Sequence, residues 1–190
     1  MAILSFVKTA SCALLITIPL LSTAYSQNQP LPKPSRDAPT EAKYQLWLDR
    51  DVRWIIAPEE RTVFSGLSRN EERDRFIEQF WLRRDPTPDT EENEYKEEHY
   101  RRIAYASEHF ATKVPSFSAT EIPGWLTDRG RIYIVFGPPD AIATVSAERS
   151  SLKRPMVVWH YRSIDGRETD LNFIDVCSCG DYRLEGLGKN

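Results

Sequence analysis

The chain has 190 residues, of which 41% are hydrophobic and 28% are charged, and its formal net charge is −3. These values are typical of a soluble globular protein and differ from those of disordered or fibrous chains. Acidic and basic side chains are interleaved, as in residues 71–75 and 95–102, so the sequence lacks the basic stripe that binds nucleic acid.

Residues 1–26 have the order of regions found in a secretory signal peptide. Lys8 is followed by a short apolar run, and small residues then allow cleavage after Ala24 or Ser26. The run is short for a transmembrane helix and contains Pro19, so we expect a cleaved leader, with an uncleaved anchor as the alternative. Export to the periplasm or the extracellular space follows, and membrane contact is expected only through this segment if it stays uncleaved.

The mature chain is expected to begin with a spacer and continue with one domain over residues 40–190. Residues 27–39 contain four prolines, which favour an extended segment. In residues 40–113, apolar side chains recur every three to four positions, which indicates three to four helices. Pro58 suits the first turn of a helix, and Pro86 ends another.

The second part of the domain, residues 131–185, predicts a sheet. Val157, Trp159 and Tyr161 occupy alternate positions, so one face of their strand is expected to be buried. Turn residues separate the strands at short spacing, which favours an antiparallel sheet of four to five strands. The predicted fold is α+β, with N-terminal helices packed on a C-terminal sheet. The expected strands are residues 131–136, 141–146, 156–162, 171–173 and 182–184.

Several spaced motifs resemble those of one protein family. Residues 124–130 read Gly-Trp-Leu-Thr-Asp-Arg-Gly and lead directly into a run that ends in Gly-Pro-Pro-Asp. Together with residues 76–88 and 97–106, they make the chain similar to the GWxTD-domain family of bacterial exported proteins. The resemblance covers about residues 40–190. It implies no particular activity, and the chain departs from the family at residues 176–180, where a glycine-rich turn is usual.

A second likeness concerns the sheet. The order Gly137–Asp140, then Trp159–Tyr161, then Leu171–Phe173 is similar to that of small lipoproteins that help to assemble outer-membrane barrels. Those proteins are non-catalytic binding modules. The likeness therefore implies a role in binding or assembly, by analogy of fold alone.

The segment 124–130 has two interpretations. In the structural one, its glycines allow sharp bends, Trp125 fills the junction of helices and sheet, and Asp128 accepts backbone N–H groups of a turn. In the functional one, the side chains of Trp125, Asp128 and Arg129 contact a ligand. The structural interpretation is favoured, because turns require these residue types in any case.

Trp159 and Tyr161 are further candidates for a binding role. The strand that carries them has short neighbours, so it can leave a sheet edge open. An open edge can accept a strand from a partner.

Cys177 and Cys179 are the only cysteines outside the expected leader. In an oxidising compartment they can form a disulfide with each other, pair with another chain or exchange disulfides. They can also be simple turn residues, which is the favoured interpretation. A redox role is disfavoured, because Cys-x-Cys lacks the helix N-terminus that activates a Cys-x-x-Cys thiol.

The sequence contains no nucleophile motif, phosphate-binding loop, dinucleotide-binding glycine pattern or His/Cys spacing for a metal. His99 shares the apolar stripe of its expected helix, as a hydrogen-bonded core histidine does. We therefore expect no catalytic residues, no metal and no cofactor.

These observations predict a non-catalytic protein of the cell envelope that binds another envelope protein or assists assembly. The binding surface is expected on the sheet or around residues 124–130. One alternative is an enzyme of unrecognised type with a site at the helix–sheet junction. A cysteine redox module is the other.

Overall fold

The computed structural model describes residues 38–113, 121–150 and 152–186. The expected leader lies outside the described residues, as does the expected spacer up to residue 37. The last two positions of that spacer, Ala38 and Pro39, are helical instead and begin the first helix.

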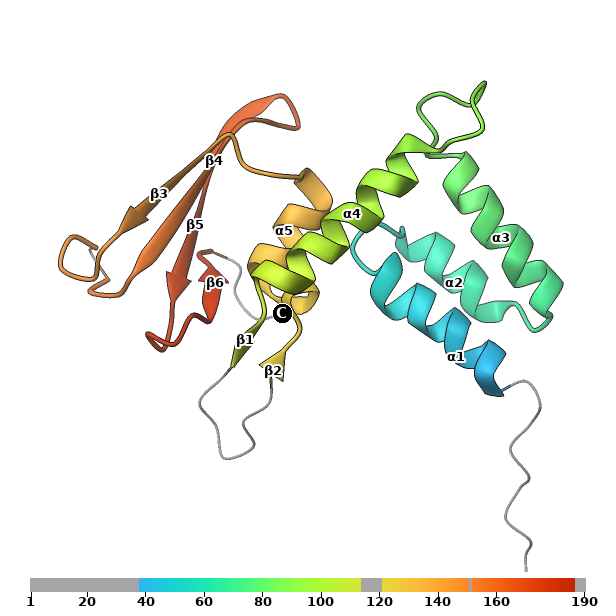
Figure 1. Ribbon diagram of the computed structural model, residues 1–190, viewed down its shortest axis with the longest axis horizontal. Helices are drawn as coiled ribbons and strands as arrows, with labels where there is room; N and C mark the ends of the chain where they lie inside the picture. Colours follow the sequence, from blue (N-terminus) through green and yellow to red (C-terminus); the bar gives the residue numbers. More distant parts are fainter. Residues whose placement is uncertain (1–37, 114–120, 151, 187–190) are drawn as a thin grey trace, which may run out of the picture. The chain divides into compact units, whose positions relative to one another are not determined.

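The described chain has an α+β fold, with most helices N-terminal to a four-stranded antiparallel sheet (Figure 1). Within the described part of the chain, no helix combines the length and the apolar character needed to cross a membrane. The helices are α1 (Ala38–Leu46, continued by a π-helical turn, Trp47–Asp51), α2 (Pro58–Gly66), α3 (Asn70–Leu82), α4 (Glu94–His109) and α5 (Asp128–Phe136, preceded by a 3₁₀ turn, Gly124–Leu126). The strands are the short pair β1 (Thr112–Lys113) and β2 (Glu121–Ile122), and the main sheet β3 (Ala141–Val145), β4 (Met156–Ile164), β5 (Arg167–Asp175) and β6 (Tyr182–Leu184).

Helices α1, α2 and α3 bury an aromatic cluster of their own. Trp47 packs against Phe64 with ring centroids 4.7 Å apart and meets Phe80 edge-on at 5.3 Å. Pro58 begins α2 as expected, and the Glu60 carboxylate accepts the free Ala57 N–H at 3.1 Å, which satisfies a donor that a helix start leaves open. The buried members of this cluster are Tyr44, Trp47, Leu48, Val52, Phe64, Phe80 and Trp81.

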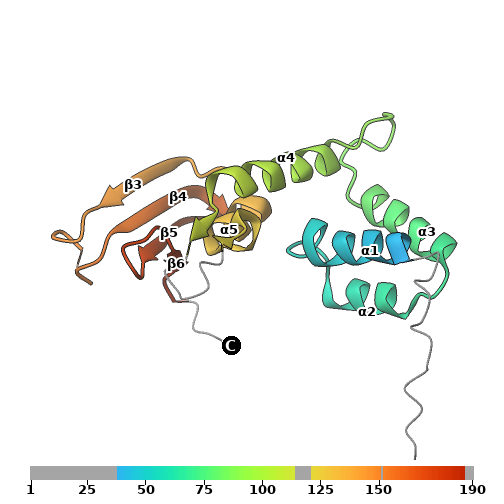
Figure 2. The ribbon, with the colours of Figure 1, turned by 60° about the horizontal axis from the view of Figure 1, so that its bottom comes forward.

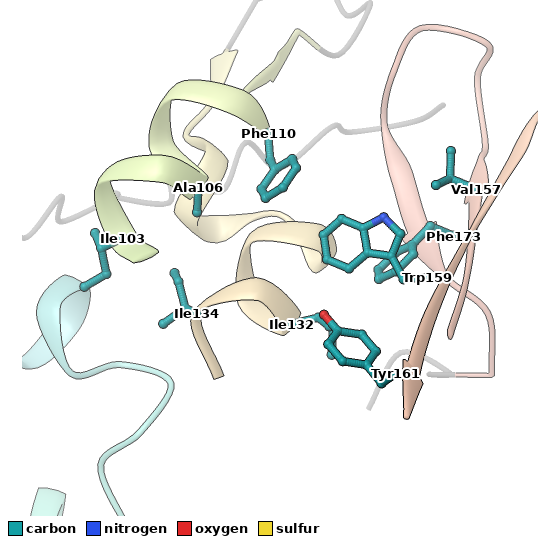
Figure 3. Packing of buried hydrophobic residues seen from close by; sticks show 9 residues of the cluster. All are labelled: Ile103, Ala106, Phe110, Ile132, Ile134, Val157, Trp159, Tyr161 and Phe173. Carbon is teal, nitrogen blue, oxygen red and sulfur yellow. The ribbon is translucent and has the colours of Figure 1, made fainter. Parts of the chain in front are cut away.

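A second core lies between α4, α5 and one face of the sheet (Figure 3). Phe110, directly after α4, faces Trp159 of β4 with ring centroids 5.5 Å apart, and Trp159 packs in turn on Phe173 of β5 at 4.8 Å. The predicted alternation in β4 is confirmed, because Val157, Trp159 and Tyr161 are all buried.

The strand order in the main sheet is β3-β4-β5-β6 (Figures 1 and 2). Strands β4 and β5 form a hairpin through Asp165 and Gly166, which both have positive φ, as a two-residue hairpin turn requires. Strand β4 is therefore interior, paired with β5 on one side and with β3 on the other. The expectation that the strand of Trp159 and Tyr161 leaves an edge open is wrong at Trp159, which pairs with Ile142 of β3. The pairing of β3 with β4 ends at His160, one residue before Tyr161.

The predicted strand at residues 131–136 is also wrong, because these residues form most of α5 and add a fifth helix to the three or four expected. Thr127 caps the helix by accepting the Gly130 N–H at 3.0 Å. At the other end Gly137 has φ +84°, and its N–H bonds to Tyr133 O at 2.8 Å. A six-residue run of β-branched and aromatic residues fits a buried strand as well as a buried helix, and here the end caps and packing on α4 decide.

Candidate functional site

The glycines at the ends of segment 124–130 permit close backbone contacts. A Cβ on Gly124 would clash with the carbonyl oxygen of Ala106 in α4. A Cβ on Gly130 would clash with the carbonyl oxygen of Gly124. The two positions therefore require glycine. A side chain at Gly124 would push the 3₁₀ turn away from α4, and one at Gly130 would push α5 away from that turn.

The polar groups between these glycines join distant parts of the chain. The Trp125 carbonyl accepts the indole N–H of Trp54 at 2.9 Å, and the half-buried Trp125 ring packs against the core of the sheet. The Asp128 carboxylate accepts the backbone N–H of Leu184 in β6 at 2.9 Å. Trp125 and Asp128 thus have structural contacts that account for their residue types.

Arg129 differs from its neighbours in the segment. Its guanidinium carbon lies 4.2 Å from the ring centroid of Tyr182 and 5.2 Å from that of Phe110, so the cation lies against two aromatic rings. Burial lowers the pKa of Arg129, and the nearby Asp175 and Asp181 partly oppose that shift. Among the described residues, the guanidinium has no carboxylate within ion-pair distance and donates no hydrogen bond.

The two nearby carboxylates are bound to other groups. Asp175 is 5% exposed and accepts the backbone N–H groups of Cys179 and Gly180 at 3.1 and 2.9 Å. Asp181 pairs with Arg183 at 2.9 Å. The Arg129 guanidinium therefore keeps its hydrogen-bonding capacity for an acceptor that the described chain does not supply.

A cavity of about 320 Å³ opens beside Arg129, between the helices and the edge of the sheet. Four of its ten lining residues are aromatic, and the Tyr105 and Tyr133 rings stack on one side with centroids 4.5 Å apart. Strand β3 contributes Ile142 and Thr144, which lie opposite Trp159 and Val157 in the sheet register. Its lining includes Tyr105, Phe110, Arg129, Tyr133, Ile142 and Trp159.

Strand β3 is an exposed edge. Four of its five residues are exposed, and Ile142 is 61% exposed although it is a large apolar side chain. One row of its backbone N–H and C=O groups pairs with β4, and an edge strand leaves the other row without a partner strand. The cavity and this edge form one continuous feature, which we call the β3 groove.

Of the five candidate binding residues named from the sequence, the structure places only some at the β3 groove. Arg129 and Trp159 both line the β3 groove, although Trp159 is only 2% exposed. Tyr161 is 4% exposed and donates a hydrogen bond to Gly137 O at 2.9 Å, so its ring offers almost no surface to a ligand. Ile142 and the tyrosines of α4 and α5 were not among the residues predicted from the sequence. The clue to Ile142 in the sequence was its place as an apolar residue in a short segment directly after the Gly-Pro-Pro-Asp turn.

Cys177 and Cys179 are joined by a disulfide, one of the states that the sequence left open. Their loop closes over the buried Asp175, whose carboxylate holds two backbone N–H groups. The possible ligand atoms of Asp175, Cys177 and Cys179 lie within 4.8 Å of one another. Both sulfurs are bonded to each other and the carboxylate is engaged by backbone amides, so this arrangement does not offer three free metal ligands.

His99 is a core residue, as its position in the sequence indicates. It is 4% exposed, and its Nε2 lies 2.6 Å from Asp51 O, so Nε2 carries the proton of the neutral ring. Burial lowers its pKa. His160 lies on the opposite face of β4 from the core and bonds to Asp170 at 2.7 Å, which raises its pKa. Neither histidine is bonded to a hydroxyl or thiol nucleophile.

These features describe an α+β domain in which two closely packed helices cover a sheet, with a groove at the sheet edge. The chain belongs to the GWxTD domain family, whose model matches residues 31–179. No match was found among the curated proteins or among the solved structures. The family signature Gly-Trp-x-Thr-Asp corresponds to Gly124–Asp128, so the residues that define the family are those that fix α5 between α4 and the sheet.

Proposed function

We propose that the protein is a non-catalytic module of the cell envelope that binds another protein by pairing an extended segment with strand β3. The observation that carries this proposal is the exposed edge strand, with Ile142 exposed beside an aromatic cavity. Backbone pairing at such an edge gives affinity, and pockets for alternate side chains give specificity.

The character of the groove supports binding rather than turnover. Apart from Arg129, the ionisable groups that line the cavity are the phenols of Tyr105 and Tyr133. A general acid or base, a nucleophile and an orienting group within hydrogen-bond reach are the usual parts of an active site. The described walls of this cavity supply no such set.

Export is part of the same proposal. It depends on residues 1–26, whose sequence has the regions of a cleavable leader. Intact-mass measurement of the protein recovered from the envelope tests it. Loss of the first 24 or 26 residues supports export, and a mass that includes the whole leader contradicts cleavage.

Site-specific photo-crosslinking in cells tests the binding surface. A photoreactive residue at Ile142 or Thr144 should give discrete crosslinked polypeptides, whereas one at Val63, which is 56% exposed on α2, should not. A lysine at position 142 should reduce the crosslinks from position 144, because charge on an edge strand opposes strand addition. Crosslinks from Val63 alone, or from none of the three positions, would reject the proposal.

A second candidate function is disulfide exchange, which the Cys177–Cys179 bond favours. Attack by the thiolate of a protein with a single free cysteine would then break the Cys177–Cys179 bond, form a mixed disulfide and release the other cysteine as a thiol, and mass spectrometry should detect the mixed disulfide. If the Cys177→Ser/Cys179→Ser double variant keeps full function in cells, this candidate is excluded.

A further inference from the structure

We propose that the β3 groove binds the free C-terminal end of its partner, with Arg129 pairing the terminal carboxylate and the aromatic cavity taking the last, apolar side chain. This inference rests on the proposed function, in which the partner lies along β3. It adds the chemical identity of the segment that binds.

The Arg129 side chain fits a carboxylate. A guanidinium has five N–H donors in a planar fork that matches a carboxylate. In Arg129 this fork is half-buried, lies against the rings of Tyr182 and Phe110, and has no acceptor among the described residues. The aromatic rings stabilise the cation and leave the N–H groups in the plane of the guanidinium free to donate hydrogen bonds. A carboxylate that enters the cavity would therefore meet an oriented, partly dehydrated cation.

The rest of the cavity fits one apolar side chain. Its volume of about 320 Å³ is at the small end of the range for ligand sites, about 300–1,000 Å³. It therefore suits one large side chain and a carboxylate rather than a whole ligand. Tyr105, Tyr133 and Trp159 provide aromatic walls for an aliphatic or aromatic group.

A chain end fits the cavity better than an internal acidic residue does. At a C-terminal residue, the carboxylate and the side chain branch from the same Cα, so one residue fills both the cationic and the aromatic part of a small cavity. An internal Asp or Glu brings a carboxylate without an apolar group beside it. The preceding residues would then continue along β3, because Ile142 and Thr144 of that strand border the cavity.

The net charge of the chain is negative, so binding of a carboxylate requires a specific site. With a formal charge of −3, the protein does not attract anions in general. Recognition of a carboxylate must then come from a local cation, and Arg129 is the cation that lines this cavity.

The experiment uses two pools of fluorescent heptapeptides that end in Phe, Leu or Trp after randomised residues. One pool has free C-terminal carboxylates and the other has C-terminal amides. Fluorescence anisotropy with the unmodified protein should give saturable binding of the free acids and about 10- to 100-fold weaker binding of the amides, as expected for the loss of a charge-assisted pair. This comparison needs no variant, so it does not depend on how well a variant folds.

Variants then locate the effect. Arg129→Gln should reduce the preference for the acid to near unity, whereas Arg167→Gln, which removes an exposed charge on β5, should leave it unchanged. Ile142→Ser should weaken both pools, because it removes the apolar side chain that β3 contributes to the cavity and leaves Arg129 in place. Circular dichroism of each variant serves as the folding control.

The outcomes distinguish the two proposals. Equal binding of acids and amides, together with crosslinks from Ile142, would overturn the carboxylate site and leave strand pairing intact. If N-acetylphenylalanine binds as tightly as the peptides, the site takes small aromatic acids and the chain-end proposal is rejected. An absence of saturable binding by either pool also rejects it, and an absence of crosslinks in addition rejects the proposed function.

Discussion

The carboxylate of Asp128 accepts a hydrogen bond from the backbone N–H of Leu184 at 2.9 Å, although the two residues are 56 positions apart in the chain. The bond joins the first turn of α5 to β6, the last strand of the sheet. Strand β6 has three residues and, among the described strands, pairs with β5 alone. The Asp of the family signature thus fixes the end of the sheet to a helix.

We expect Asp128→Ala to lower the free energy of unfolding by about 1–3 kcal/mol, the range for hydrogen bonds to a charged group. Hydrogen exchange at the Leu184 amide should become faster, because the N–H loses its acceptor. Urea unfolding and exchange measured by NMR check both effects. Asp89→Ala, at an exposed loop position, is the control and should change neither.

Gly124→Ala should destabilise the protein far more than the same change at Gly66. At Gly124 the added methyl group meets the backbone of α4, and overpacking of this kind costs about 1–3 kcal/mol or more. At Gly66, at the end of α2, a Cβ meets nothing within 4 Å, and alanine is the better helix former. Thermal melts of the two variants measure the difference. Equal melting temperatures would show that the 3₁₀ turn at Gly124 is not closely packed against α4.

The length of each apolar pattern decided which elements of this fold could be predicted from the sequence. Periodic apolar residues identified the helices before residue 110 and the buried face of β4, because those patterns are long. The run at 131–136 was too short to distinguish a strand from a helix. The signals that favour the helix were Thr127 before the run, and Gly137 with two prolines after it, which are a cap and a stop.

The candidate site was predicted less well, for a different reason. Alternation in Trp159 and Tyr161 predicts which face is buried, but it does not say which strands lie on either side. The pairing of β3 with β4 moved the free edge to Ile142. Arg129 lies against Tyr182 and Phe110 only because α5 is a helix that packs on both α4 and β6, and a predicted strand at that place could not indicate this contact.

Stability below pH 4.5 should depend on Glu60. Burial raises the pKa of Glu60, but hydrogen bonds from Arg84, Arg83 and the Ala57 N–H outweigh burial and lower it from 4.5 to about 2. Because the folded pKa is the lower one, this stabilisation is present above about pH 4.5 and is lost as the pH falls toward about 2.

The test compares Glu60→Gln with Glu59→Gln, which changes an exposed carboxylate in the same helical turn. At neutral pH, Glu60→Gln should cost about 1–3 kcal/mol, because two arginines lose a charged acceptor. The difference between the variants should shrink as the pH falls below 4.5. A constant difference in urea unfolding over this range would contradict the assignment.

His99 should make the protein less stable in mild acid. Its pKa is lowered by burial in the folded state, so the unfolded chain takes up a proton at a higher pH than the folded chain does. The contribution of the neutral His99 to the free energy of unfolding is therefore fully present above the unfolded pKa of about 6.5 and decreases as the pH drops below it. His99→Gln keeps a donor for Asp51 O and should reduce the loss between about pH 7.5 and about pH 5.5. His160→Gln, on the exposed face of β4, should not reduce it, since the folded pKa of His160 is raised.

The last prediction concerns the loop of Cys177 and Cys179. A disulfide between residues two apart closes a very short loop, so it removes little conformational entropy from the unfolded chain. The loop also has a second support, because the buried Asp175 carboxylate accepts the N–H groups of Cys179 and Gly180. The Cys177→Ser/Cys179→Ser variant should therefore lose less than about 1 kcal/mol, whereas Asp175→Ala should lose about 1–3 kcal/mol by leaving two backbone donors without an acceptor. Urea unfolding of both variants measures the order of the two effects. If the cysteine variant is the less stable of the two, the disulfide and not the carboxylate holds the loop.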